Sequence, residues 1–200
     1  MSTVLVDLPP EWVAADLDAD PLGWARATVR RRAREQQVDL ERERADRLAD
    51  VFLPALESAH REDVPPALVL FLLPEAERSA VCSVTVRAEE VDPDVAAEDL
   101  LEQLRLPEEM LEQPAVEEIV ETRCGPAVHL IQRYRSPQGV DFELVQEHEL
   151  FLWHLADDDG EWAITLSTGY LDLVEAAEWR PSLRDLATSL TLTADQDSVL

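Results

Sequence analysis

Hydrophobic and polar positions change their period along this chain, and each period predicts an element. Seven apolar residues run without interruption from 67 to 73, the pattern of a strand buried on both faces. Residues 80–87 alternate apolar and polar side chains, as a strand with one face in the core does. Turn residues separate two further pairs of strand-like segments, which predict hairpins: 116–122 with 127–135, and 142–154 with 162–170, the second joined through 157–160.

Helical spacing covers much of the remainder. Asp20 and Pro21 give a helix start, and apolar residues at helical spacing predict one long helix over 21–59, kinked at Pro54. A second helix begins near Asp92 and ends before Pro107. The pattern then predicts a short helix over 172–179 and a final helix that begins with Pro181 and Ser182. A short strand over 190–193 follows.

These elements predict an α+β fold, a mostly antiparallel sheet of hairpins with helices before, between and after it. We expect a single domain over 1–200. Within it, residues 21–61 form an arginine-rich long N-terminal helix or arm, and 194–200 form a frayed tail.

The order of elements resembles the PsbP-like fold, an α/β/α sandwich. An early strand with Leu8-Pro9-Pro10-Glu11-Trp12 carries the resemblance, together with the first hairpin formed by 67–73 and 80–87, the helix in mid-chain, the late hairpin formed by 142–154 and 162–170, and the closing segment Pro181–Leu190. The arginine-rich segment departs from the pattern. The resemblance implies a binding or adaptor domain without catalysis, and it transfers no ligand-binding residue to this chain.

Charge narrows the possible functions. The chain has 43 acidic residues against 17 basic ones, for a net charge of −26. All the basic residues are arginine, which suggests a GC-rich bacterial source. Such a charge opposes general nucleic-acid binding and adhesion to anionic lipid. No apolar run has the length of a membrane span, and the N-terminus has no basic region followed by an apolar run. We therefore expect no membrane insertion and a cytoplasmic protein.

The sequence offers little chemistry for catalysis. His148 and His154 are six residues apart on one predicted strand, about 20 Å at 3.3 Å per residue, so they cannot share a metal or a proton. No His/Cys/Asp cluster has ligand spacing, and no nucleophile elbow or phosphate loop occurs. We expect no enzyme activity, cofactor or metal. Cys82 should be buried, and Cys124 should lie near the surface without a disulfide to it.

Two groups of residues are candidates for partner binding. Nine of the arginines fall between Arg26 and Arg61, so this stretch is near +2 while the remainder carries −28. The sequence thus favours a non-enzymatic protein-binding or adaptor module, whose partner is an acidic protein or a second copy. An acidic inhibitor, such as an immunity protein or a nucleic-acid mimic, is the alternative. The candidate partner-binding residues are Arg30, Arg31, Arg32, Arg34, Trp153 and Trp162.

Overall fold

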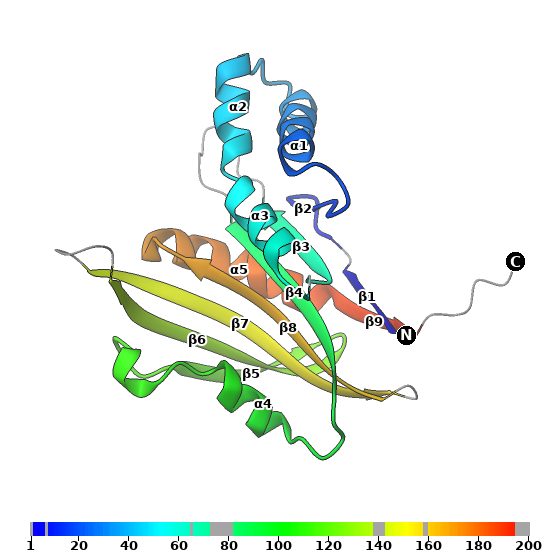
Figure 1. The fold of residues 1–200 in the computed structure, drawn as a ribbon, viewed down its shortest axis with the longest axis vertical. Coiled ribbons are helices and arrows are strands. Elements are labelled where there is room, and N and C mark those ends of the chain that lie inside the picture. The colour runs from blue at the N-terminus through cyan, green and yellow to red at the C-terminus, as the bar shows by residue number, and fades with distance from the viewer. Residues whose placement is uncertain are drawn as a thin grey trace, which may run out of the picture. The chain divides into compact units, whose positions relative to one another are not determined.

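The computed structural model describes residues 2–6, 8–64, 66–72, 82–137, 143–157 and 160–194 (Figure 1). Helices and antiparallel strands make up this part of the chain, which confirms the α+β class. Strand pairing follows the order β2-β3-β4-β8-β7-β6-β5, with β1 and β9 as a separate pair. The chain divides into two compact units, Pro9–Thr85 and Met1–Leu8 with Val86–Leu200.

The unit Pro9–Thr85 is mainly helical. An aromatic cluster forms the centre of its core, with ring centroids of Trp24, Phe52 and Phe71 between 4.9 and 5.8 Å apart. Small and aliphatic side chains of the helices pack around this cluster. The complete elements of the unit are β2 (Trp12–Ala14), α1 (Pro21–Glu35), α2 (Arg42–Asp50), α3 (Leu53–Arg61) and β3 (Leu68–Leu72).

The prediction of one long helix over 21–59 is wrong. α1 ends in a Schellman motif, because the amide of Gln37 bonds to the carbonyl of Arg34 and the amide of Val38 bonds to that of Ala33. Gln37 has a positive φ of 57°, so the chain leaves the helix there. A second break precedes α3, whose first turn contains Pro54. Three short helices can bury their apolar residues in one core, which a straight helix cannot.

The second unit is built on long antiparallel strands. β5 (Val116–Thr122) and β6 (Gly125–Pro137) form one hairpin, with Thr122 opposite Gly125 across a two-residue turn. β7 (Glu143–Asp157) and β8 (Gly160–Tyr170) form the other. Both hairpins were predicted, although Asp158 and Asp159 of the second turn lie outside the described residues. The other strands are β4 (Cys82–Val91), which begins in the helical unit, β1 (Ser2–Val6) and β9 (Leu190–Ala194).

Helices cover both faces of these strands. α5 (Leu173–Ser189) packs on β5, β7 and β8, and α4 (Ala97–Leu104), followed by the 3-10 turn η1 (Glu108–Met110), lies on the opposite face (Figure 1). α5 was expected as two helices divided at Pro181. It is continuous because its buried side chains continue across the proline, and their packing outweighs the one backbone hydrogen bond that the proline removes. The buried side chains are Ala176, Trp179, Leu183, Leu186 and Ala187.

The predicted strands at 67–73 and 80–87 correspond to β3 and β4. The link between them, 73–81, lies outside the described residues, as does 195–200 of the predicted tail. Cys82 is buried, as its strand alternation predicted, and Cys124 is half-buried with its thiol donating to the carbonyl of Leu190 at 3.1 Å.

Candidate functional site

The predicted arginine group lies at the C-terminal half of α1. Arg30, Arg31 and Arg34 are exposed, whereas Arg32 is half-buried and pairs with Glu35 at 3.3 Å. The Arg34 side chain donates from Nε to the carbonyl oxygen of Arg30 at 3.1 Å. Because Arg30 and Arg34 are one turn apart, their side chains lie on the same side of α1; Arg31 borders that side and Arg32 lies opposite to it.

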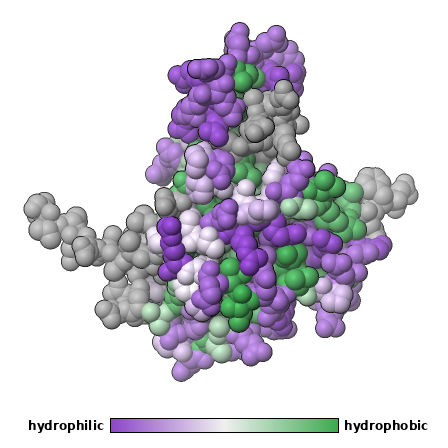
Figure 2. Space-filling model, turned by 180° about the vertical axis from the view of Figure 1, so that it is seen from behind, coloured by the Kyte–Doolittle hydropathy of each residue, from purple (hydrophilic) through white to green (hydrophobic). Residues whose placement is uncertain are grey.

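A groove of about 460 Å³ lies beside Arg30 and Arg34. The Schellman turn after α1 sends the chain back, so that α2 adds Arg42 to the same groove. Between these arginines the lining is apolar, formed by Ala33, Val38, Leu40 and Ala45, with Asp39 as its acidic residue. We call it the arginine groove. In Figure 2 the region formed by α1 and α2 is mostly hydrophilic, with a small hydrophobic area among the hydrophilic side chains.

The groove arginines, like Arg31 beside them, have no acidic partner among the described residues, unlike Arg26, Arg32, Arg47 and Arg61. Within the described part of the chain, no carboxylate lies at ion-pair distance from Arg30, Arg34 or Arg42. Other arginines of the same unit are neutralised locally, Arg47 by Glu43 at 2.8 Å and Arg61 by Glu57 at 2.6 Å. A guanidinium binds a carboxylate through two parallel hydrogen bonds, so three unpaired arginines form a surface suited to carboxylates.

The two predicted tryptophans lie in different environments. Trp153 is 0% exposed, and its indole donates to the hydroxyl of Thr122 at 2.9 Å, so it belongs to the core and takes no part in a surface. Trp162 is half-buried on β8, opposite Leu155. Neither lies in the arginine groove.

A chain of alternating charges lies between β5–β7 and α5, and sequence reasoning missed it. At its centre are Glu147 and Glu149 of β7, both 0% exposed. Arg180 of α5 bonds to both carboxylates, with 3.2 Å between its Nε and Glu149. Arg133 of β6 bonds to Glu147 at 2.6 Å. Each buried carboxylate thereby has a cationic partner, without which its burial would be strongly unfavourable.

The same ion chain continues through a histidine toward the edge strand. His129, 2% exposed, lies between two carboxylates, 2.8 Å from Glu149 and 3.0 Å from Glu118. Its ring stacks on Phe151 with centroids 4.2 Å apart. Glu118 also binds Arg184 of α5 at 2.7 Å. The hydrogen bond from His129 lowers the pKa of Glu118, and Arg184 adds to this effect.

This ion chain is suited to fixing α5 on the sheet. Burial alone would lower the pKa of Arg180, but the carboxylates of Glu149 and Glu147 raise it above its ordinary value. The sequence contained one signal for this cluster. Glu147 and Glu149 have the same parity as the buried Phe151 and Trp153, so they had to face the same side of β7.

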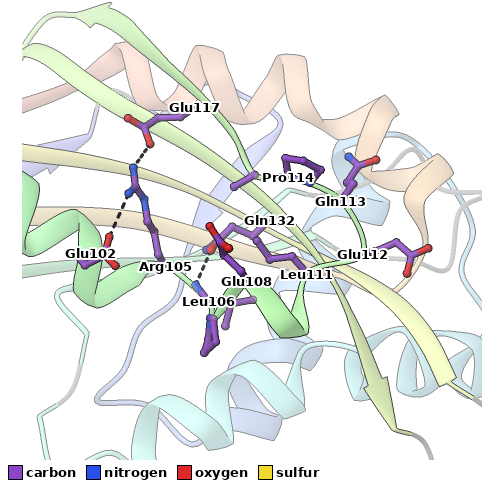
Figure 3. Close-up of a pocket in the computed structure, with 12 residues that line it drawn as sticks. Glu102, Arg105, Leu106, Glu108, Leu111, Glu112, Gln113, Pro114, Glu117 and Gln132 are labelled. Atoms are coloured by element: carbon purple, nitrogen blue, oxygen red, sulfur yellow. Dashed lines mark hydrogen bonds and ion pairs between the residues drawn. The ribbon is translucent and has the colours of Figure 1, made fainter.

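The opposite face has a cavity of about 740 Å³ between the α4–η1 segment and β5–β6. In Figure 3 Arg105 lies between Glu102 and Glu117 and is bonded to both. Those bonds raise the pKa of Arg105, the one to Glu117 most strongly. Gln132, 0% exposed, holds the backbone at the cavity by accepting from the amide of Leu106 at 2.6 Å. The carboxylates of Glu102 and Glu117 are therefore already bound to an arginine of the protein itself.

The remaining candidate chemistry is dispersed. In the part of the chain that the structure describes, no group of three or more His, Cys, Asp or Glu residues could hold a metal ion. His148 lies opposite Gln132, and burial lowers its pKa. His154 pairs with Glu161 at 2.9 Å on the neighbouring strand. No described helix is both long and apolar enough to cross a membrane.

Comparison with known proteins identifies a structural neighbour. No family model matches this chain, and no curated protein matches it in sequence. Among solved structures it is similar to LpqN of Mycobacterium tuberculosis, described as involved in cell envelope biogenesis. The TM-score is 0.55 at 11% identity, over 97% of this chain and 85% of that one. At this identity the likeness concerns the fold alone.

Proposed function

We propose that this chain is a non-enzymatic protein-binding module that takes an acidic segment of another protein in the arginine groove. One observation carries the proposal: Arg30, Arg34 and Arg42 surround an apolar lining and have no described carboxylate partner, in a chain with 43 acidic residues. Arginines left unpaired where carboxylates are this abundant are available to an external one.

The mixed lining favours a peptide segment over other anions. Val38 and Leu40 offer apolar contact that acidic segments with interspersed leucine or valine can use, whereas a phosphate chain cannot. Nucleic acid brings one charge per about 1.7 Å and would be repelled by the net charge of −26. A second copy brings another −26, so an acidic segment of a different protein is the favoured occupant.

The acidic-inhibitor alternative has less support. A mimic presents free carboxylates to a basic site, but several carboxylates at the large cavity already bind arginine. Glu102 and Glu117 share Arg105, and Glu112 binds Arg135. The cytoplasmic location stays a prediction.

A matched pair of variants tests the groove. Replacing Arg30, Arg34 and Arg42 with glutamine removes three positive charges from the groove. Replacing Arg44, Arg47 and Arg61 removes the same charge from elsewhere in the same unit. A fluorescein-labelled peptide of alternating glutamate and leucine, followed by anisotropy, should bind wild type and control alike. The groove variant should bind about tenfold more weakly, and salt should weaken the wild-type complex.

The same three proteins also identify the natural partner. A protein captured from the host by wild type and control, but not by the groove variant, should bind through a segment of net negative charge. The proposal is wrong if the groove variant and its control behave alike toward the peptide, or if the captured segment is basic.

A further inference from the structure

The edge strand β5 has backbone groups that face away from the sheet. β5 is the last strand in the pairing order and pairs with β6 along its whole length. Thr122 and Gly125 are partners across a two-residue turn, so they exchange both hydrogen bonds. Alternation then directs the amides and carbonyls of Val120, Glu118 and Val116 toward β6.

The intervening residues Glu117, Ile119 and Glu121 therefore direct their amides and carbonyls outward. No described residue outside β5 makes a backbone hydrogen bond to these three. A sheet edge of this kind is a template for another extended strand. The edge is also long enough, since β5 has seven residues.

The side chains at this edge are unusual for an unpaired strand. Ile119 is 71% exposed and Val116 is 50% exposed, although both are β-branched residues that gain stability by packing against a neighbouring strand. Ile119 lies between Glu117 and Glu121 on the α4 face, because residues two apart share a face. The edge thus presents a central apolar side chain flanked by two carboxylates.

The charges of this pattern select its partner. Glu121 has no ion-pair partner among the described residues, and Glu117 shares its carboxylate with Arg105. In an antiparallel β5–β5 pair centred on Ile119, each Glu117 would lie opposite a Glu121, and like charges in direct opposition are destabilising. A second copy is therefore a poor occupant. An incoming strand with basic residues opposite the two glutamates and an apolar residue opposite Ile119 is complementary.

We propose that β5 is a docking edge for an extended basic peptide segment of a partner protein, added to the sheet by backbone pairing. The segment carries Arg or Lys two residues on either side of an apolar residue. This site is in the other unit from the arginine groove and is opposite to it in charge, so it does not depend on the function proposed above.

The first test uses a defined probe. It is a fluorescein-labelled seven-residue peptide with threonine at alternate positions, arginine at the second and sixth, and valine in the centre. The peptide should bind wild type, more weakly as salt rises. A peptide with glutamate in place of arginine should not bind. Binding of both peptides alike would overturn the charge argument, and binding of neither would overturn the proposal.

Two variants separate backbone pairing from surface adhesion. Ile119→Pro removes an outward amide without removing a bond to β6, so it should weaken binding at least about tenfold. Ile119→Thr keeps that amide and is the matched control, with a smaller loss. Glu121→Arg should weaken binding about fivefold, whereas Asp50→Arg, the same charge change in the other unit, should not. If the proline variant binds as well as the threonine variant, the proposal fails.

Hydrogen exchange gives a readout that needs no substitution. In free protein the amides of Glu118 and Val120 should be protected, and those of Glu117, Ile119 and Glu121 should exchange quickly. Saturating peptide should protect the second set. Protection confined to other strands would place the peptide elsewhere and contradict the proposal.

Discussion

Replacing Arg180 with methionine removes the central cation of the ion chain and keeps a long unbranched side chain. Among the described residues, Glu147 is then left with Arg133 and Glu149 with His129. Both carboxylates are 0% exposed, and removing one partner from a fully buried pair costs about 3–5 kcal/mol. The Arg180 side chain is itself 28% exposed, so water compensates part of the loss. We expect a cost of about 2–4 kcal/mol.

Arg184→Met is the matched control. Arg184 is on the same helix, one turn further, and its pair with Glu118 has both side chains almost half exposed. Such pairs contribute about 0–1 kcal/mol. Urea unfolding followed by circular dichroism measures both variants against wild type. Equal losses for the two variants would refute the reasoning that burial makes the Arg180 contacts strong.

A triple variant separates lost charge from lost packing. In Arg180→Met, replacing Glu147 and Glu149 with glutamine removes the two buried charges that lost Arg180 as a partner. Stability should then recover in part, because a neutral amide costs less to bury than a carboxylate whose charge is only partly compensated. A further loss would show that methionine packing, not charge, causes the defect.

The other predictions concern titratable groups. The pKa of Glu118 is lowered in the folded protein, so its stabilising contribution is present above the ordinary carboxyl range and is lost as pH falls through the lowered value. In urea unfolding at a series of acidic pH values, the stability of Glu118→Gln should therefore fall less steeply than that of wild type. The pKa of His148 is also lowered, by burial, so stability should fall as pH drops below about 6.5, and His148→Gln should remove that dependence from pH-dependent urea unfolding. Thiol titration of native protein should modify half-buried Cys124 before buried Cys82, and the reverse order would contradict their positions.

Strand periodicity was sufficient to predict most of the strands, β3 to β8, because its signal is local, whereas the three-residue strand β2 and the order of the strands were not predicted. Residues 80–87 were predicted to alternate with one face in the core, and Cys82, Val84 and Val86 of β4 are buried. A turn was predicted between the segments 116–122 and 127–135, and Gly125 beside that turn has a φ of 110°, which favours glycine. Where local pattern and packing agree, the prediction needs no tertiary information.

The helices were harder because non-local packing decides where they end. Gln37 adopts a positive φ although glutamine has no preference for one, so the break after α1 was not predictable from the sequence. Arg42 joins Arg30 and Arg34 only because of that break, and it was missed for this reason. Conversely, Pro181 was taken as a boundary although buried side chains keep α5 continuous. The buried glutamates were missed because acidic residues are ordinarily solvated.

Because the chain is synthesised from its N-terminus, the division into two units affects the order in which they can fold. Pro9–Thr85 is one uninterrupted stretch, so all its residues have been translated before most of the other unit exists. The other unit requires Ser2 to pair with Ala194, and β1 must therefore wait for almost the whole chain. During that interval all residues of the helical unit Pro9–Thr85 are present, whereas the strands of the other unit still lack partner strands. The segment most exposed to misassembly at this stage is β1, whose partner β9 lies near the other end of the sequence.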